Sequence, residues 1–294
     1  MSENEELIVS PNKELDHLIK LLDDEDDNIY SSVKERFLSF GNQSEDFLKN
    51  YLNDKNILIN KRANEIVSIL NFKNLEKKFF RLNPENKDFL EEAVFLISSY
   101  GYPGIDAAHY RNMISDYAAV IRLNIIKKFG KADPENPLDY LETINDFLFK
   151  DKMFRGNNDN YYDPDNSFLN KVIDNKTGIP ITLSVIYLLV SRKLNLPVYG
   201  INMPGHFLLK YEKEKVEYYI DPFNGGIIIS GPEAERFAKN LGIQKSDFDK
   251  IPYLNKTTDL EIILRILRNL IEIYKKEEEL KASQIDKLMN SLVR

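Results

Sequence analysis

The chain has 294 residues, of which 43% are apolar and 30% charged, a composition typical of a folded protein with one large domain or two smaller ones. Its formal net charge is −7, and the 40 basic residues are scattered among 47 acidic ones, so we expect no nucleic-acid partner. The sequence contains no cysteine, which excludes disulfides, thiolate nucleophiles and cysteine-ligated metal centres.

Targeting signals are not evident at the beginning of the sequence. Residues 1–10 lack both the basic region and the long apolar region of a secretory signal. The longest apolar stretch, residues 179–190, is too short to span a bilayer and includes Thr and Ser. These features predict a cytoplasmic protein without a membrane partner.

An internal repeat occupies the N-terminal part of the chain. At an offset of 30 residues, residues 51–70 echo residues 21–40, so that Leu52 matches Leu22 and Asp54 matches Asp24. Each copy has apolar residues at helical spacing and an Asx-rich turn that can cap a helix, which predicts two stacked helical hairpins. Such a pair is similar to a short HEAT-type repeat and suits either protein interaction or the covering of a neighbouring domain.

The acidic run at residues 23–27 raises the alternative of a calcium loop. It lacks the mid-loop glycine and the terminal glutamate spacing of an EF-hand. We interpret it as a solvated turn and helix cap.

Helical periodicity continues through the next part of the chain. Leu90, Val94 and Ile97 share one helix face, and a Gly-Pro break precedes a long helical segment at residues 107–129 and another at 138–149. His109 lies on the long segment without an acidic neighbour in sequence, and we interpret it as a surface or packing residue.

Residues 153–171 change character, because Gly, Asn, Asp, Pro and Tyr dominate them. This composition predicts an ordered polar loop, which could form one wall of a cleft. Asp159, Asp163 and Asp165 have the oxygen ligands for calcium but no loop glycine, so a turn leading into a helix is the simpler interpretation.

The following segment predicts an α+β core. Residues 181–190 are apolar all round, as in a helix buried on every side. Short β-prone pieces separated by turns then predict a small antiparallel sheet packed on that helix; they comprise residues 198–201, 206–211, 216–220 and 226–230. Two further helical segments, residues 260–274 and 282–293, complete extensive all-α flanks.

Several blocks in this order resemble the SirB invasion-regulator family, whose core is transglutaminase-like and belongs to the papain-like superfamily. The blocks are "FRGN", "YYDPDNSFLNKVI", "GIPITLSVIYL", "LNLPVYGINMPGHFLLKY" and "IDPFNGG". The resemblance extends over roughly residues 89–274. Its last part, the helical segment that begins at residue 260, lies at the place where relatives continue into a tetratricopeptide-like helical pair. Together with the N-terminal repeat, the resemblance predicts a HEAT-like region at 1–85, a transglutaminase-like core with its helical lead-in at 86–250, and a truncated tetratricopeptide-like tail at 251–294.

The resemblance also implies a site. In thiol members of the superfamily, a Cys at the start of the buried helix is the nucleophile, a strand His is its base, and an Asp on the next strand orients the imidazole. The motifs carry the base onto His206 and the orienting carboxylate onto Asp221, and the nucleophile position falls near Pro180. The nearest hydroxyls belong to Thr182 and Ser184, which are either nucleophiles or helix-cap residues.

Two main functions follow from these residues. The first is a non-catalytic regulatory or protein-interaction module with a protein or peptide partner, because the thiol is missing. The alternative is an amide or peptide-bond hydrolase or transferase that uses a His206–Asp221 dyad with Thr182, Ser184 or water. A third hypothesis is a small-ligand sensor built from the dyad and the Tyr-rich loop. We expect no cofactor and no metal, because a catalytic zinc usually takes three protein ligands and the three histidines lie far apart in sequence.

Overall fold

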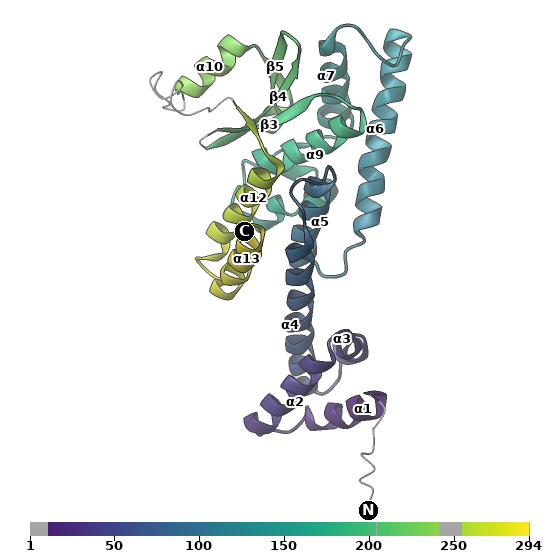
Figure 1. Cartoon of the computed structure of the whole chain (residues 1–294), viewed down its shortest axis with the longest axis vertical. Helices are drawn as coiled ribbons and strands as arrows, with labels where there is room; N and C mark the ends of the chain where they lie inside the picture. Colours follow the sequence, from purple (N-terminus) through teal and green to yellow (C-terminus); the bar gives the residue numbers. More distant parts are fainter. Residues whose placement is uncertain (1–10, 204, 241–254, 294) are drawn as a thin grey trace, which may run out of the picture. The chain divides into compact units, whose positions relative to one another are not determined.

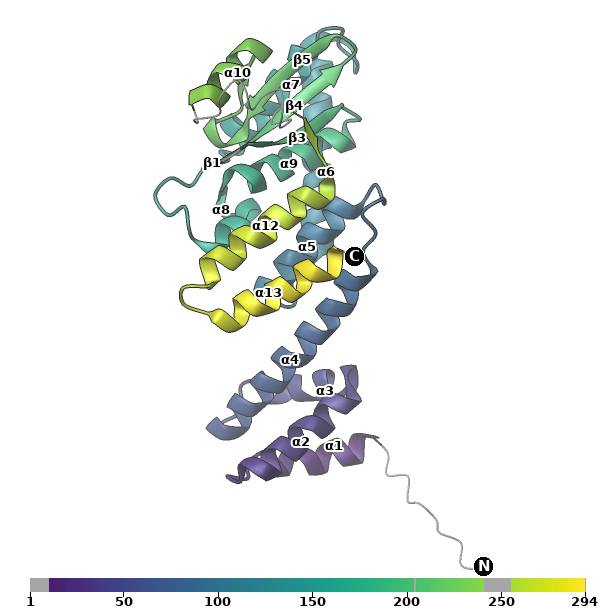
Figure 2. The ribbon, with the colours of Figure 1, turned by 60° about the vertical axis from the view of Figure 1, so that its left-hand side comes forward.

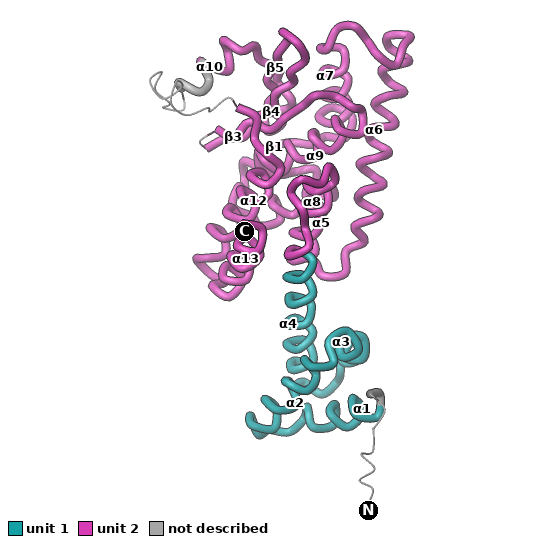
Figure 3. Tube along the Cα trace, viewed as in Figure 1, with its two compact units in different colours: residues 1–78 teal, residues 79–294 magenta. Residues whose placement is uncertain are grey.

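The computed structural model describes residues 11–203, 205–240 and 255–293. The chain forms two compact units, residues 1–78 and residues 79–294, which are coloured separately in Figure 3. The sequence-based boundary between residues 250 and 251 lies outside the described residues. The two units are therefore treated one at a time.

The first unit is entirely helical in its described part. Its elements are α1 (Pro11–Leu21), α2 (Asp27–Phe40), α3 (Asn42–Leu48), the 3-10 helix η1 (Lys49–Tyr51) and α4 (Ile57–Arg81), whose last residues belong to the second unit. One apolar core, which includes Leu15, Phe37, Leu48 and Ile66, joins these helices. Neither helical pair could bury this much apolar surface alone, so they stack.

The 30-residue repeat persists in the helix caps. The side chain of Asp26 accepts a hydrogen bond from the N–H two residues on (2.7 Å), and Asn56 repeats this contact (2.9 Å). Asp24 and Asp54, two residues earlier, accept in the same way at 2.9 and 2.8 Å. The acidic run thus caps α2, since its side chains satisfy backbone donors that the helix leaves unpaired.

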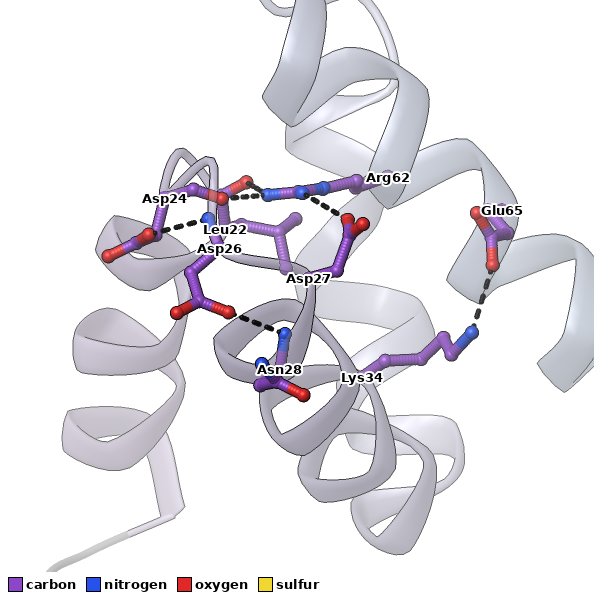
Figure 4. A network of polar contacts seen from close by, with 8 residues as sticks. All are labelled: Leu22, Asp24, Asp26, Asp27, Asn28, Lys34, Arg62 and Glu65. Carbon is purple, nitrogen blue, oxygen red and sulfur yellow. Dashed lines mark hydrogen bonds and ion pairs between the residues drawn. The ribbon is translucent and has the colours of Figure 1, made fainter.

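A buried arginine links the two copies of the repeat (Figure 4). The guanidinium of Arg62, on α4, donates to the carbonyl oxygen of Leu22 (3.0 Å) and also to that of Asp24. It lies 4.2 Å from the ring centroid of Tyr30 and 3.8 Å from the carboxylate of Asp27. The charge is therefore compensated although the side chain is buried.

The second unit contains an antiparallel five-stranded sheet in the order β6-β5-β4-β3-β7. Its strands are β3 (Val198–Met203), β4 (His206–Lys213), β5 (Val216–Asp221), β6 (Ile227–Ile229) and β7 (Lys256–Thr257). The four longer strands coincide with the β-prone pieces of the sequence. The sequence does not reveal β7, because two residues carry no alternating pattern.

Helix α9 (Pro180–Lys193) packs against β3 and β4, and α6 (Ala107–Phe129) also contacts it (Figure 1). Helix α8 (Leu169–Asn175), labelled in Figure 2, contacts α9 as well. Every residue of α9 from Pro180 to Ser191 is buried. This environment explains a helix that is apolar all round, because it has no solvent-facing side.

The other α-helices in the described part of this unit are α5 (Phe89–Gly101), α7 (Pro137–Asn145), α10 (Gly231–Asn240), α12 (Asp259–Tyr274) and α13 (Glu279–Leu292). Helices α12 and α13 lie side by side, and α12 also packs against α5 (Figure 2). The helix predicted at 138–149 changes type, since a π-helical turn, η2 (Asp146–Asp151), follows α7. Within this turn, Phe149 stacks on the buried Tyr187 of α9 with ring centroids 6.4 Å apart.

The polar segment after η2 is ordered by a short parallel pair, β1 (Arg155–Gly156) with β2 (Thr177–Gly178). The N–H of Asn157 donates to the carbonyl of Gly178 (3.0 Å), and the buried Asn166 side chain donates to the carbonyl of Asn160 (2.7 Å). Asn166 belongs to the 3-10 helix η3 (Pro164–Ser167). These contacts hold the loop beside the first turn of α9.

Candidate functional site

The site forms where two neighbouring strands end. His206 is the first residue of β4 and Asp221 is the last residue of β5, and these strands pair antiparallel. The imidazole Nε2–H donates to Oδ2 of Asp221 at 2.8 Å. Both residues are largely buried, with 8% and 6% of their surface exposed. A hydrogen bond of this kind fixes the orientation of the ring.

The carboxylate of Asp221 is itself held in place. Its Oδ1 accepts from the backbone N–H groups of Phe223 (3.1 Å) and Asn224 (3.2 Å), and its Oδ2 also accepts from the Asn224 side chain (2.8 Å). It thereby caps the 3-10 helix η4 (Pro222–Asn224). Burial raises the pKa of the Asp221 carboxyl, but the hydrogen bond and charge of His206 and the bonds from Asn224 outweigh burial, so the pKa is lowered.

Aromatic rings lead from the imidazole to the polar loop. Phe223 meets His206 edge-on with centroids 6.2 Å apart, and Tyr161 meets Phe223 edge-on at 6.3 Å. A Cβ atom at Gly156 would lie 2.6 Å from the Phe223 ring, so any residue other than glycine would clash with this ring. The dyad is therefore bordered by Phe223, with Tyr161 beyond it.

Thr182 forms part of the backbone structure at the start of α9. Its Oγ1 accepts from the N–H of Ile179 (3.2 Å) and donates to the carbonyl of Asn166 (2.7 Å), with the carbonyl of Ile179 at 3.1 Å. A Cβ at Gly178 would come within 2.9 Å of this oxygen. The hydroxyl thus serves as a helix cap and ties α9 to η3.

Ser184 is fully buried on α9, and within the described chain its hydroxyl has no hydrogen-bond partner. Among the described residues, no hydrogen bond joins Thr182 or Ser184 to His206. The structure thus brings His206 and Asp221 together and leaves both hydroxyls outside their hydrogen-bond network.

Two residues that sequence reasoning missed support the site. Asn224 holds the carboxylate, and its position in an Asx-rich "DPFN" turn could have indicated this. Arg265 of α12 donates to the carbonyl of Met203 (3.1 Å) and to the side chain of Asn202, at the end of β3. Burial lowers the pKa of the Arg265 guanidinium, and this effect outweighs the opposing effect of the charge of nearby Tyr161. Nothing in the helical pattern of α12 distinguishes this arginine.

Two of the aspartates considered as calcium ligands, and His109, make contacts within the fold. Asp163 caps η3 by accepting from the N–H of Asp165 (2.9 Å), and Asp165 accepts from the hydroxyl of Tyr102. His109 is exposed, and its ring meets that of Tyr110 edge-on at 5.3 Å. Across the described residues, no group of three or more His, Asp or Glu side chains is arranged to hold a metal ion.

Among the residues that the structure describes, no helix combines the length and the apolar character needed to cross a bilayer.

The sequence resemblance predicted a buried helix, a small antiparallel sheet and a His–Asp contact at two strand ends, and the structure has these three features. Residues 108–268, more than half of the chain, match the family model described as the transglutaminase-like superfamily. The chain belongs to this superfamily.

Several curated proteins match parts of this chain in sequence. A "UPF0162 protein" of Xylella fastidiosa is 35% identical over 187 residues, which are 63% of this chain and 64% of that protein. Another "UPF0162 protein", from Vibrio cholerae, is 36% identical over 82 residues, 28% of this chain and 30% of the relative. "F-box only protein 21" of Mus musculus is 36% identical over 103 residues, 32% of this chain and 16% of the relative.

The alignment thus spans slightly less than two thirds of the Xylella relatives. No solved structure matches the chain.

Proposed function

We propose that this chain is a non-catalytic transglutaminase-like protein that binds a protein or peptide partner as a regulatory or scaffolding module. The observation that carries the proposal is the hydroxyl of Thr182, which donates its hydrogen to the carbonyl of Asn166 at 2.7 Å in a sequence without cysteine.

Acyl transfer needs a nucleophile whose proton can pass to the base. For Thr182 to react, it would have to release the Asn166 carbonyl, and α9 would lose the contact that ties its first turn to η3. Ser184 is fully buried and would have to be uncovered first. In this proposal, the role of the His206–Asp221 pair is to link β4, β5 and η4.

The helical flanks are the second part of the proposal. We assign residues 1–85 to a HEAT-like region and α12–α13 to a truncated tetratricopeptide-like pair, as in the SirB family. Stacked helical pairs offer extended surfaces that suit partner proteins. The 103 residues matched in the mouse F-box only protein 21 make up 16% of that protein, so the related stretch is one part of a longer chain. We assign a similar modular use to this chain, in the cytoplasm.

The test is a binding measurement on the full-length protein. Crosslinking in extract of the source cells should repeatedly recover the same partner, which should then bind the purified chain saturably in a calorimetric titration. Binding should persist in Ser184→Ala, which removes a candidate nucleophile at a buried position. A chain that finds no saturable partner and turns over an amide substrate would contradict the proposal.

The buried His206–Asp221 hydrogen bond of 2.8 Å favours a second candidate function, hydrolysis or transfer at an amide or peptide bond. In this candidate His206 is the base, Asp221 orients it, and Thr182, Ser184 or water attacks the carbonyl. The test compares turnover of peptide and glutamine-amide substrates by the wild-type protein and by His206→Ala. Equal signals from both proteins would end this candidate.

A further inference from the structure

Helix α6, at the edge of the second unit in Figure 1, carries apolar residues on two opposite sides. The buried side includes Ile114 and Ile121. The outer side is defined by Val120, Leu123 and Ile126, of which 41%, 64% and 40% is exposed. Nine residues make about two and a half helical turns, so Leu123 points away from Ile114. A surface helix normally directs polar residues to the solvent, so the outer side of α6 has the composition of a face that is covered.

Charged residues of opposite sign stand at the two ends of this outer side. Asp116 lies four residues before Val120, and Lys127 lies four residues after Leu123. This spacing places each charge on the same helix face as its apolar neighbour. Both charged residues are exposed, and among the described residues neither side chain takes part in an ion pair or a hydrogen bond. The outer side therefore has, in chain order, an acid, an apolar centre and a base.

This order is complementary to itself about a two-fold axis. Because each helical residue rises 1.5 Å, Asp116 and Lys127 each lie about 8 Å from the midpoint between them. When a second α6 packs antiparallel with its midpoint at the same level, each Asp116 is level with Lys127 of the second copy. Each Val120 is then level with Leu123 of the second copy. A parallel pair would instead put carboxylate beside carboxylate, which is unfavourable.

We propose that the chain forms a homodimer in which the outer side of α6 packs antiparallel against the outer side of α6 in a second copy. The same patch serves both copies, as a two-fold interface requires. Burial of the apolar residues drives the association, and the two flanking ion pairs fix the antiparallel direction. The inference goes beyond the proposed function, because it concerns contact between two copies of this chain.

The dimer is expected to be weak. Helix α6 has 23 residues and is therefore about 35 Å long, and one pair of such helices makes an interface at the small end of the range. We expect a dissociation constant of about 10 µM for the full-length protein. Sedimentation velocity from about 1 to 200 µM should show a change from monomer to dimer.

Substitutions on the outer side should weaken this dimer. Leu123→Glu should raise the dissociation constant at least about thirtyfold, because the two-fold axis buries two carboxylates in the apolar centre. Asp116→Lys and Lys127→Asp should each raise it about fivefold, since each creates two contacts between like charges. All three positions are exposed, so the far-UV circular dichroism of the monomer should not change.

The decisive arm mixes the two charge variants. In a dimer of one Asp116→Lys chain and one Lys127→Asp chain, both flanking pairs again join opposite charges. The mixture should therefore associate about as tightly as wild type, although each variant alone associates weakly. Lys128→Asp is the matched control, because it reverses the same charge at the next exposed position of α6, about 100° around the helix, and should leave association unchanged.

A wild-type chain that stays monomeric at the highest concentration would overturn the inference and leave this face to a different protein. A dimer that Leu123→Glu does not weaken, or a mixture of the two charge variants that associates no better than either alone, would also overturn it. None of these measurements uses the partner protein, so the crosslinking result still decides the proposed function.

Discussion

The paired ends of β4 and β5 and the first turn of α9 belong to one core, but they use their polar groups differently. At the strand ends, His206 and Asp221 bond to each other through side chains. In the first turn of α9, Thr182 bonds only to backbone groups, and the Ser184 hydroxyl has no partner in the described chain. One region has the arrangement of a base and its orienting acid, whereas the other has the arrangement of a helix cap.

The pair at the strand ends also has contacts within the fold that do not involve a nucleophile. The carboxylate of Asp221 accepts hydrogen bonds from η4 as well as from the imidazole, so it has a structural role whether or not a nucleophile stands opposite.

The largest effect is expected for Asp221→Ala. This change removes the hydrogen bond between Asp221 and the buried imidazole of His206 and uncaps η4, so we expect a loss of about 3 kcal/mol in the free energy of unfolding. Urea denaturation at neutral pH measures it. Asp221→Asn is the control, because an amide oxygen can still accept the backbone N–H groups, and it should cost about half as much. An alanine variant as stable as wild type would contradict a structural role.

A pH dependence follows from the lowered pKa of Asp221. Because its pKa in the folded state lies below the unfolded value of about 3.9, the folded protein binds fewer protons, and this stabilisation is complete above that pH. It is lost as the pH falls through the folded-state pKa. Urea denaturation of wild type and Asp221→Asn should show a stability difference that shrinks below about pH 4. A difference that grows on acidification would contradict the sign.

Thr182→Val tests the helix side of the comparison. Valine has a similar volume but leaves the carbonyl of Asn166 and the N–H of Ile179 without this partner, so we expect a loss of about 1.5 kcal/mol. Thermal and urea denaturation measure it, and Thr182→Ser should restore most of the stability. If valine caused no loss, the hydroxyl would not be acting as a cap.

The smallest effect is expected for Ser184→Ala. The buried hydroxyl has no partner in the described chain, so its removal eliminates an unsatisfied polar group and should change stability by less than about 0.5 kcal/mol in either direction. The same denaturation measurement applies. A loss above about 1 kcal/mol would indicate a hydrogen bond made through water.

The elements that follow a regular pattern could be predicted from the sequence. The helical spacing at residues 107–129 coincides with α6, and the β-prone pieces coincide with β3 to β6. The His206–Asp221 contact could be anticipated because a motif order fixes which strand ends are adjacent. These features depend on local periodicity or on neighbouring strands.

Features that depend on distant packing could not be predicted. Thr182 bonds to a carbonyl 16 residues earlier, Arg62 reaches a carbonyl 40 residues earlier, and Arg265 contacts the end of β3 from 62 residues away. Both arginines occupy ordinary positions in amphipathic helices. Their roles appear only when the helices are packed, because hydrophobic periodicity identifies the buried face of a helix but not the group that it meets.

In the proposed function, the first turn of α9 is structural and forms no covalent intermediate. The most direct test is the intact mass of the full-length protein during incubation with a glutamine-amide peptide and with an activated ester of the same acyl group, followed by peptide mapping. We predict no acyl adduct on Thr182 or Ser184, and the same result for wild type and His206→Ala. An adduct on either hydroxyl that forms in wild type and disappears in His206→Ala would contradict the account.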